Sequence, residues 1–403
     1  MRRMASDYDD GKGEIPLSVC IITKNDRKRL ERLISTFEKV PVEIVIEDTG
    51  SDDGTVEMLK TVKKKRNITD IYYMWDNDFA AAKNHCFKAA KNNLILSIDS
   101  DECPGKDGAV DAADAYKMLM DGKFQPPEKL EKELRKIAKA GEEYFNLKAV
   151  GLVKRINFYM EENEIAENVE MLPRVFDRRV VEYKGCIHEQ LLTKDGKNPP
   201  KRIATELSFF HDGYMGTKEE CEAKAYRNIK LLKKMLEDSG ENDSYLFYQL
   251  GKSFYSIGDF ESSVENFEEV LERDVDPKLT YVQDCIVTYG YALLNTRRNE
   301  NIRAAIQLLN LEEFFDDDSD FYFLMGHILR ENGLFDKAIE YFIKATKAKH
   351  EKTKGTSSYL SFYNIGVILE VTGNKKEALK YYRTCGKYEP ARIRVGKLEG
   401  ENG

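Results

Sequence analysis

The stretch Asn92–Gly105, NNLILSIDSDECPG, decides the fold, because a short apolar run ends directly in three acidic residues. Its apolar part, Leu94–Ile98, has the composition of a buried strand. Such strands do not tolerate unpaired charge, so Asp99, Asp101 and Glu102 should lie at the carboxyl end, where open α/β sheets bind ligands. Two acids one residue apart can share a hard divalent cation that takes its other ligands from phosphates and water. A solvated acidic turn is the alternative.

The size and charge of the chain exclude several classes of protein. Its 403 residues are too many for one ordinary core and indicate more than one domain. The formal net charge of -8 argues against a protein that coats nucleic acid or an anionic membrane. Neither a signal peptide nor an apolar run long enough to span a bilayer is evident. The scattered cysteines, without a Cys-x-x-Cys pair, fit reduced thiols. We therefore expect a soluble cytoplasmic protein without a nucleic-acid partner.

The first half of the chain, residues 15–215, alternates short apolar strands with segments of helical periodicity. Strands are expected at 17–22, 42–47, 70–75 and 94–98. This alternation predicts a parallel sheet with right-handed crossovers. The segments KAVGLVKRINFYM, VVEYKG and ATELSFFH should add further strands, and residues 105–141 should form a loop and a helix over the acidic site.

The second half, residues 244–390, has a helical pattern with an internal repeat. Three stretches align, each with a glycine twelve residues before a small residue and an aromatic residue four later. These triplets are Gly251, Ser263 and Phe267; Gly326, Ala338 and Phe342; and Gly366, Ala378 and Tyr382. The spacing is typical of tetratricopeptide repeats, in which small residues let paired helices approach closely. A weaker copy around Gly290 predicts four helical pairs in all, and an ordinary helical bundle is the alternative.

The expected domain boundaries follow from these patterns. We expect a disordered lead at 1–14, an α/β domain at 15–215, a connecting helix at 216–243, repeats at 244–390 and a tail at 391–403. The connecting helix should open with a capping box formed by Thr217 and Glu220. It presents Lys224 and Arg227 on one face, where they could close on phosphates or form a solvated basic face.

Several further polar residues follow the predicted strands. Thr23 and Asn25 come off the end of the first strand, and Asp48 ends the second strand before a glycine-containing turn. A carboxylate at the position of Asp48 can accept the ring N–H of a nucleobase. The helix before the acidic strand opens at the same edge, which should bring its polar residues, Asp78, Lys83 and Asn84, close to the acids.

Histidines also follow strands of this domain: His188 is next to Glu189, and His211 ends the segment ATELSFFH. A single histidine is more often a satisfied structural residue than a ligand. Two of the five histidines at such positions favour a functional role.

Six ordered motifs carry a resemblance to a known family: LSVCIITKND, VIEDTGSDDGT, WDNDFAAAKN, LILSIDSDE, RVFDRRVVEYKGCIHEQLL and FFHDGYMGTKEECEAKAYRNIKLL. They resemble the motifs of inverting family-two glycosyltransferases. More narrowly, they are similar to bacterial members with tetratricopeptide repeats behind the catalytic domain, among them the peptide S- and O-glycosyltransferases that modify bacteriocins called glycocins. The resemblance implies an α/β nucleotide-diphosphosugar transferase (A-type glycosyltransferase) domain followed by an all-α tetratricopeptide solenoid.

The resemblance also implies roles for individual residues. Asp48 and Thr23 would bind uracil, and Asp99 would lie toward the ribose and metal-bound water. Asp101 would ligate a divalent ion, Mn²⁺ or Mg²⁺, that bridges the diphosphate, and His211 would complete the metal shell. Lys83 stands where relatives usually have Arg, which keeps the charge but loses the bidentate fork.

The reaction implied by the resemblance needs a base that faces the anomeric carbon opposite the diphosphate. Glu189 is the first candidate and His188 the second, and a structural Glu189 paired to Arg174 or Arg178 is the alternative. We expect a metal-dependent inverting transferase that moves a sugar from a UDP-sugar to a Cys, Ser or Thr side chain of a peptide or protein. The repeats would hold the acceptor.

Two other functions are compatible with the sequence. The same chemistry could act on an envelope or lipid-linked glycan, with the repeats forming a homodimer. A non-catalytic scaffold would have the repeats as its function, but the intact acidic sequence DSDE, residues 99–102, argues against it.

Overall fold

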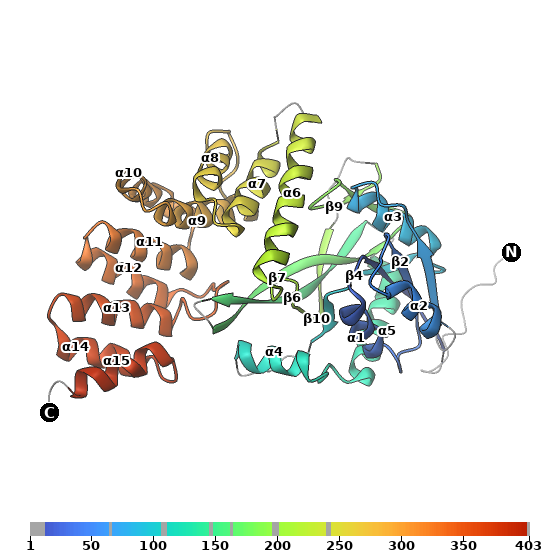
Figure 1. The fold of residues 1–403 in the computed structure, drawn as a ribbon, viewed down its shortest axis with the longest axis horizontal. Helices are drawn as coiled ribbons and strands as arrows, with labels where there is room; N and C mark the ends of the chain where they lie inside the picture. Colours follow the sequence, from blue (N-terminus) through green and yellow to red (C-terminus); the bar gives the residue numbers. More distant parts are fainter. Residues whose placement is uncertain are drawn as a thin grey trace. The chain divides into compact units, whose positions relative to one another are not determined.

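The computed structural model describes residues 13–63, 67–105, 111–144, 148–161, 164–195, 201–238 and 243–400. The chain divides into two compact units, residues 1–216 and 217–403, and each is described by itself (Figure 1). Residues 1–12 of the predicted lead lie outside the described part of the chain.

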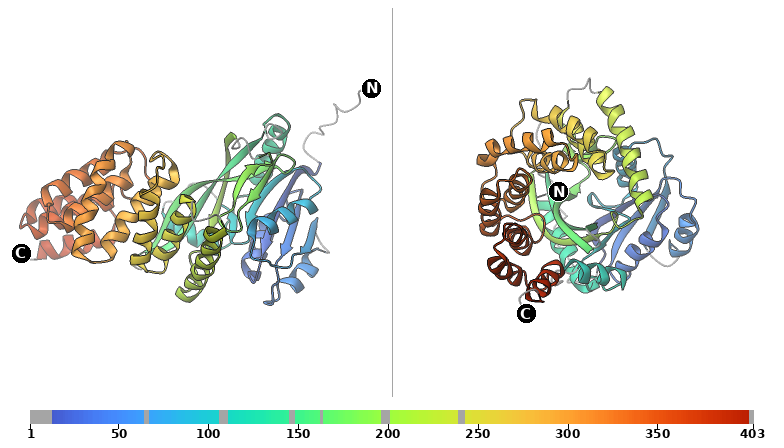
Figure 2. Two further views of the ribbon diagram at one scale, coloured as in Figure 1. Left: turned by 90° about the horizontal axis from the view of Figure 1, so that it is seen from above. Right: turned by 60° about the vertical axis from the view of Figure 1, so that its left-hand side comes forward.

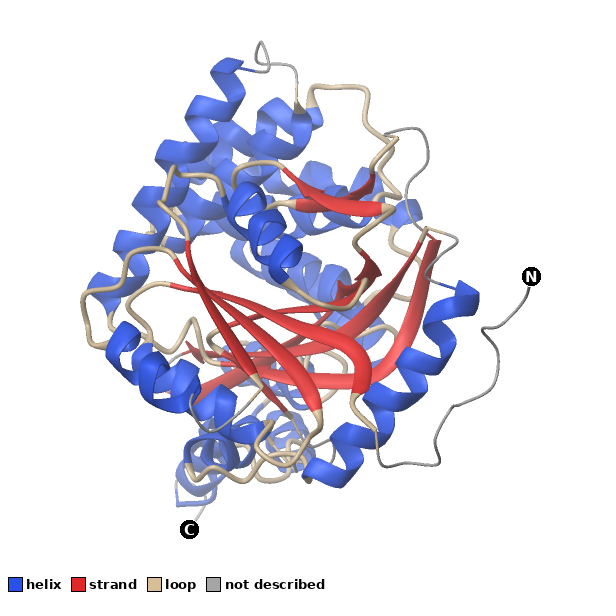
Figure 3. Cartoon of the chain, turned by 90° about the vertical axis from the view of Figure 1, so that its right-hand side faces the viewer, coloured by secondary structure: helices blue, strands red, loops and turns tan. Residues whose placement is uncertain are grey.

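The first unit contains both strands and helices (Figure 3). Its strands are β1 (Ile15–Thr23), β2 (Val42–Asp48), β3 (Ile68–Tyr72), β4 (Leu94–Asp99), β5 (Glu102–Pro104), β6 (Ala149–Glu161), β7 (Glu164–Asp177), β8 (Val181–Lys184), β9 (Gln190–Thr193) and β10 (Lys201–His211). Its helices are α1 (Arg27–Thr36), α2 (Thr55–Val62), α3 (Phe79–Ala89), α4 (Ala112–Met120) and α5 (Pro127–Tyr144).

Eight of these strands form one sheet in the order β3-β2-β1-β4-β7-β6-β10-β5. The four strands β3, β2, β1 and β4 are parallel, as predicted from their alternation with helices. The second half of the sheet is mixed, because β7 runs antiparallel to both β4 and β6, and β5 runs antiparallel to β10. Strands β8 and β9 pair as a separate hairpin.

Alternate side chains of the parallel strands enter two different cores, as expected from the period of a strand. On one face, Val19 and Ile21 of β1 pack in a cluster with apolar residues of α1, α2, α4 and α5. On the other face, Cys20 packs with Cys86 and Phe87 of α3 and with residues of the β8–β9 hairpin. The sheet is therefore covered on both faces, which explains why β1 and β4 are mostly apolar.

The segment 105–141 differs from the prediction of one helix over the acidic site. It contains two helices, α4 and α5, and residues 106–110 lie outside the described part. A Cβ added to Gly141 of α5 would lie 2.9 Å from the side chain of Leu94, which begins β4. The end of α5 therefore packs at the opposite end of the strand from the acids.

The second unit is helical throughout its described residues (Figure 2). Its elements are α6 (Lys218–Asp238), α7 (Ser244–Ser256), α8 (Phe260–Leu271), α9 (Thr280–Asn295), α10 (Asn299–Ala304), the 3₁₀ helix η3 (Ala305–Phe314), α11 (Ser319–Glu331), α12 (Phe335–Lys347), α13 (Tyr359–Val371), α14 (Lys375–Thr384) and α15 (Glu389–Gly400). The predicted capping box is present: Thr217 N–H donates to Glu220 at 2.9 Å, and Glu220 N–H donates to Thr217 Oγ1 at 3.3 Å. Helix α15 covers most of the predicted tail.

The repeat triplets meet as their spacing predicts. A Cβ added to Gly251, Gly326 or Gly366 would lie within 2.6 Å of an aromatic ring, that of Phe267, Phe342 or Tyr382 respectively. Each glycine on the first helix of a pair therefore lets the ring on the second helix pack directly against backbone.

The weaker repeat copy departs from the regular helical pair. Its first helix is α9, but its second helix begins as the short α10 and continues as η3, which has the tighter 3₁₀ winding. The 3₁₀ segment spaces its side chains differently from an α-helix, which accounts for the weaker match of this copy to the repeat pattern. No helix of the described residues is long and apolar enough to cross a membrane.

Candidate active site

The ends of the parallel strands bring the predicted site residues to one edge of the sheet. In the strand register, Thr23 of β1 is the partner of Asp48 of β2, and Ile22 of β1 is the partner of Asp99 of β4. Asp101 and Glu102 follow Asp99 directly. The expectation that the acids lie at the carboxyl edge of the sheet is therefore confirmed.

Asp99 is held by two cations from opposite sides. Lys83 of α3 approaches one carboxylate oxygen at 2.9 Å, and Arg174 of β7 approaches the other at 2.7 Å. Burial disfavours the charged form of Asp99, but Arg174 and Lys83 outweigh it and hold its pKa well below the usual range. Asp99 is thus a permanent anion, and its charge is compensated by the protein.

Glu102 is almost fully buried, with 1% of its surface exposed, and has a structural role. One oxygen accepts the backbone N–H of Asp99 at 3.0 Å. The other accepts from Arg174 at 2.8 Å and lies 3.5 Å from Arg155. The carboxylate of Glu102 therefore fixes the turn after β4. Asp101, which lies between Asp99 and Glu102 in the sequence, faces a different partner, His211.

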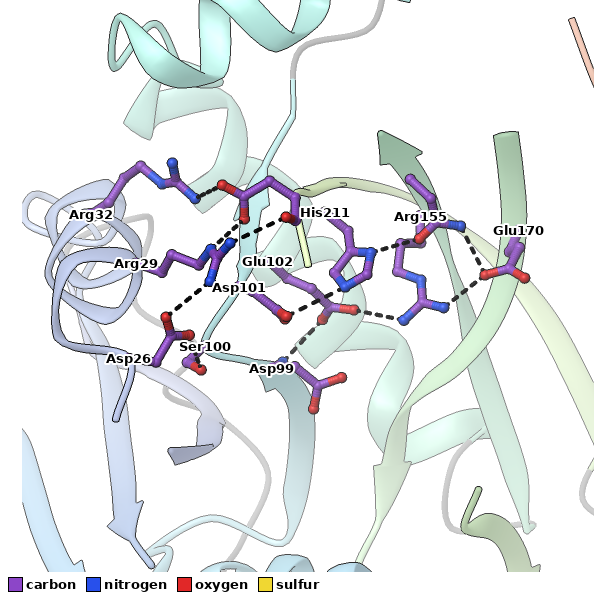
Figure 4. A network of polar contacts seen from close by, with 12 residues as sticks. Asp26, Arg29, Arg32, Asp99, Ser100, Asp101, Glu102, Arg155, Glu170 and His211 are labelled. Carbon is purple, nitrogen blue, oxygen red and sulfur yellow. Dashed lines mark hydrogen bonds and ion pairs between the residues drawn. The ribbon is translucent and has the colours of Figure 1, made fainter. Parts of the chain in front are cut away.

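Asp101 faces His211, which ends β10 (Figure 4). Oδ2 of Asp101 lies 3.4 Å from Nε2 of His211, and Nδ1 of the same ring lies 2.8 Å from the amide oxygen of Asn157. The orientation of that amide is set because its nitrogen donates to Asn168 at 2.7 Å and to Glu170 at 2.9 Å. The ring of His211 is therefore held at Nδ1 by the oxygen of Asn157, and its Nε2 points toward Asp101.

Gly213 keeps the space in front of these two groups open. A Cβ at this position would lie 2.4 Å from Nε2 of His211 and 2.5 Å from Oδ2 of Asp101. Such contacts are far shorter than any real Cβ makes, so a residue with a side chain at this position would displace both His211 and Asp101.

The turn that carries His211 and Gly213 is tied to helix α1 by a pair of arginines. Asp212, only 4% exposed, accepts from Arg29 at 3.0 Å and from Arg32 at 2.7 Å. Arg29 also lies 3.4 Å from Asp26, which accepts the hydroxyl of Ser100 at 2.6 Å. These bonds, drawn in Figure 4, fix the turn against the loop that contains Asp101.

Two side chains at this edge, Asp101 and His211, are suitable ligands for a divalent cation. A carboxylate oxygen of Asp101 and a ring nitrogen of His211, both of which can serve as metal ligands, face each other beside Gly213. No group of three or more His, Cys, Asp or Glu side chains is placed to hold a metal ion within the described residues. The remaining ligands would therefore come from phosphate oxygens and water.

Thr23 and Asp48 share an unusual feature. Oδ1 of Asp48 accepts the backbone N–H groups of Gly50 and Ser51, each at 2.9 Å. Oδ2 of Asp48 and Oγ1 of Thr23 are buried, and neither has a hydrogen-bond partner among the described residues. Buried polar atoms without partners cost about 1–3 kcal/mol each, so two of them side by side point to a ligand that supplies the missing bonds.

Two other predicted donor-site residues make local structural contacts. Asn25, with φ of 53°, accepts the N–H of Asp52 at 2.8 Å and so holds the turn after β2. Asp78 caps α3 by accepting the N–H of Ala81 at 2.8 Å. Both roles place these residues at the predicted edge, and their part in donor binding stays a prediction.

Asn84 lies differently from what the sequence indicated. Its amide donates to the carbonyl oxygen of Tyr183 at 2.8 Å and accepts the N–H of the same residue at 3.0 Å. The side chain therefore pins α3 to β8 rather than pointing to the acids, because neighbouring residues on a helix project about 100° apart. Lys83, one position earlier, is the residue that points to Asp99.

The two candidate bases lie on the loop before β9. Glu189 is ion-paired to Lys83 at 2.7 Å, so the expected alternative partners, Arg174 and Arg178, were wrong. Lys83 is buried, and although burial disfavours its charge, Asp99 and Glu189 raise its pKa above the usual value. His188 adopts a left-handed backbone with φ of 49°, a conformation that costs a non-glycine residue energy and often marks a functional loop.

Lys224 and Arg227 lie on α6, which belongs to the second unit. Both side chains are exposed. The structure describes the two units separately, so their proposed contact with the donor phosphates stays a prediction.

The sequence analysis missed Asn157, Gly213 and the arginine pair of α1. The arginines had a visible signal, since Arg29 and Arg32 are three apart on an otherwise amphipathic helix and Asp212 directly follows a candidate ligand. Asn157 had none, because it reaches His211 only through the pairing of β6 with β10.

Comparison with known proteins agrees with this geometry. Residues 18–115 match the family model for glycosyl transferase family 2. This segment is therefore similar to a family 2 glycosyltransferase domain. Residues 244–276, 319–350 and 359–392 match the tetratricopeptide repeat, and the matches omit the copy that contains η3.

Two relatives show how far the similarity extends. The SPbeta prophage-derived glycosyltransferase SunS of Bacillus subtilis (strain 168) is 24% identical over 265 residues, which cover 65% of this chain and 55% of SunS. A TPR repeat-containing protein of Synechococcus elongatus is 24% identical over 299 residues, which cover 73% of this chain and 65% of that protein. The chain thus spans between half and two thirds of the length of these relatives.

A solved structure of S. aureus TarS 1-349 in complex with UDP-GlcNAc is also similar. It matches with 12% sequence identity and a TM-score of 0.34, covering 82% of this chain and 91% of that chain. A TM-score this low supports no argument about function.

Proposed function

We propose that the protein is a metal-dependent inverting glycosyltransferase that moves a sugar from a UDP-sugar to a side chain of a peptide or protein. The observation that carries this proposal is the pair of unpartnered buried atoms, Thr23 Oγ1 and Asp48 Oδ2, on the same sheet edge as Asp99 and Asp101. One ligand that spans this edge needs a group with an N–H at one end and an anionic group near the acids at the other.

The nucleobase end selects uracil in this proposal. Oδ2 of Asp48 accepts only, so it would take the ring N3–H of uracil, and the hydroxyl of Thr23 can donate to a ring carbonyl. Adenine has no ring N–H at the corresponding edge, so Asp48 would face an acceptor instead.

The diphosphate end is served by Asp101 and His211, which would hold Mn²⁺ or Mg²⁺. A bound divalent ion acts as a Lewis acid that stabilises the charge on the leaving diphosphate. The chain positions these ligands itself: Asn157 binds Nδ1 of His211 and so orients the ring, and the bonds of Arg29 and Arg32 to Asp212 hold the turn in place. Lys83 and Arg174 hold Asp99, so Asp101 is the acid proposed to bind the ion.

Glu189 is the proposed base, with His188 as the second candidate. Its ion pair with Lys83 keeps Glu189 in reach of the acidic edge. Glu189 would take the proton from the acceptor hydroxyl or thiol while the acceptor atom attacks the anomeric carbon. The bond from that carbon to the diphosphate breaks in the same step, so UDP leaves and the configuration inverts.

The repeats are the proposed acceptor platform. Helices α7 and α9 carry a cluster of tyrosines with ring centroids 5.3 to 5.8 Å apart, in which Tyr248 is buried and Tyr245 and Tyr281 are partly exposed. Tyrosine supplies contact area with little loss of conformational entropy, which suits an extended peptide.

Calorimetry with UDP, GDP and ADP in the presence of Mn²⁺ tests the donor assignment. We expect UDP to bind most tightly. The variant Asp48→Asn keeps the oxygen that caps the turn but turns the second atom into a donor, so UDP affinity should fall about 10- to 100-fold. Asp52→Asn is the matched control, because Asp52 is exposed on the same turn and should leave affinity unchanged.

Tighter binding of GDP than UDP would contradict the proposal. Equal losses in Asp48→Asn and Asp52→Asn would show a general charge effect in place of base recognition.

A further inference from the structure

A second polar pocket lies at the other edge of the sheet from the acids. It has a volume of about 290 Å³ and is lined by residues at the end of α3, before β4 and around the β8–β9 hairpin. Asn93 lines it and directly precedes β4, whereas Asp99 ends that strand. At about 3.3 Å per residue, roughly 20 Å of strand separates the pocket from the acidic site.

Three cations that line the pocket have no carboxylate partner among the described residues. Lys88 and Lys194 are exposed, and neither makes an ion pair with a described residue. Arg178 donates to the carbonyl oxygens of Phe87 and Lys88, the latter at 3.2 Å, and so satisfies the last turn of α3. These bonds use neutral acceptors, so the charge of Arg178 also remains uncompensated.

The other charged groups of the lining cancel. Arg179 is paired with Asp177 at 2.6 Å. Glu182, the acid of the lining, is paired with Lys184 at 2.9 Å. The pocket therefore keeps an excess of three positive charges, those of Lys88, Arg178 and Lys194, in a protein whose net charge is -8.

We propose that this pocket binds the phosphate group of a small ligand. Three cations that line one pocket match the charge and the several acceptor oxygens of a phosphate, and Arg178 offers a planar donor group. Phe87 and Val181, both buried, provide an apolar wall for the rest of the ligand. The volume lies near the lower limit for pockets that hold small molecules, which favours a compact phosphate ester. This site goes beyond donor binding, because it shares no residue with the acidic edge.

The test measures binding of inorganic phosphate, diphosphate and glycerol 3-phosphate to the full chain by calorimetry. Saturating UDP and Mn²⁺ are present throughout, so that the proposed donor site is filled. The double variant Lys88→Gln/Lys194→Gln should weaken phosphate binding about tenfold or more. The control Lys117→Gln/Lys139→Gln removes the same charge from exposed positions of α4 and α5 and should change affinity less than about twofold.

Hydrogen exchange shows where on the chain the phosphate binds. Phosphate should slow exchange in the segments 84–93 and 178–194 of the parent and leave the loop after β4 unchanged. Vesicles of phosphatidylcholine with and without phosphatidic acid then identify the source of the phosphate: cosedimentation lost in the double variant assigns a lipid headgroup, and its absence assigns a soluble ester. The proposal is overturned if the parent binds no phosphate at millimolar concentration, if both double variants lose affinity equally, or if the slowed exchange maps elsewhere.

Discussion

His327 of α11 makes the stability of the repeats depend on pH. Its ring packs against aromatic rings, with centroids 4.6 Å from Phe323, 5.4 Å from Phe342 and 6.4 Å from Tyr291. Burial and the nearby Arg330 lower the pKa of His327 to about 3. The imidazole is therefore neutral in the folded repeats at any pH above that value.

The sign and size of the effect follow from linkage. Unfolded, His327 titrates near its ordinary pKa of about 6.5, so between about pH 3 and 6.5 the unfolded chain binds more protons than the folded one. The stability from neutral His327 is complete above about pH 6.5 and is lost as the pH falls toward 3. At pH 5 the loss is at most about 2 kcal/mol, an upper limit because the edge of the ring keeps some contact with solvent.

Urea denaturation followed by far-UV circular dichroism at about pH 7 and pH 5 measures this loss. The variant His327→Gln removes the titrating group and keeps a neutral polar side chain, so the helical transition should lose about 2 kcal/mol less than the parent on acidification. His350→Gln, in an exposed loop, is the matched control and should behave as the parent. If His327→Gln and the parent lose equal stability, the ring is not kept neutral by its surroundings.

Three further changes test other contacts. Asn157→Ala should weaken Mn²⁺ binding about 10- to 100-fold, measured by calorimetry, because the ring of His211 loses the contact that orients it; an unchanged affinity would remove His211 from the metal site. Lys83→Met should cost about 3–5 kcal/mol of unfolding free energy by leaving Asp99 and Glu189 without their shared cation, and a neutral result would show that Arg174 is sufficient for Asp99. Gly326→Ala should cost about 1–3 kcal/mol by forcing Phe342 away. Gly396→Ala in α15 has open space around it and should stabilise by up to about 1 kcal/mol, so a loss of equal size in both would refute the packing argument.

The sequence predicted what depends on local periodicity. The parallel strands β1 to β4 follow from apolar runs that alternate with helices, and the triplet around Gly326 follows from spacing within one helical pair. The edge that holds Asp99 and Asp101 follows from the same reasoning, because charge cannot remain inside a buried strand.

Contacts between distant strands could not be predicted in this way. Arg174 reaches Asp99 only because β7 runs antiparallel beside β4, and nothing in the local pattern specifies that pairing. Asn84 shows the other limit: it is next to Lys83 in sequence, but the turn of the helix directs it to Tyr183. The repeat copy around Gly290 shows a third limit, because the change to 3₁₀ winding in η3 is not visible in the composition of the segment.

The measurement that tests the proposed activity most directly is release of UDP from a panel of UDP-sugars by the purified chain with Mn²⁺. The account predicts slow release from at least one UDP-sugar, loss of that release with EDTA, and loss in Asp101→Asn while the fold is intact by circular dichroism. Release that is indifferent to EDTA, or parental turnover in Asp101→Asn, would contradict the metal site formed by Asp101 and His211. No release from any UDP-sugar, with or without peptide, would contradict the proposed enzyme.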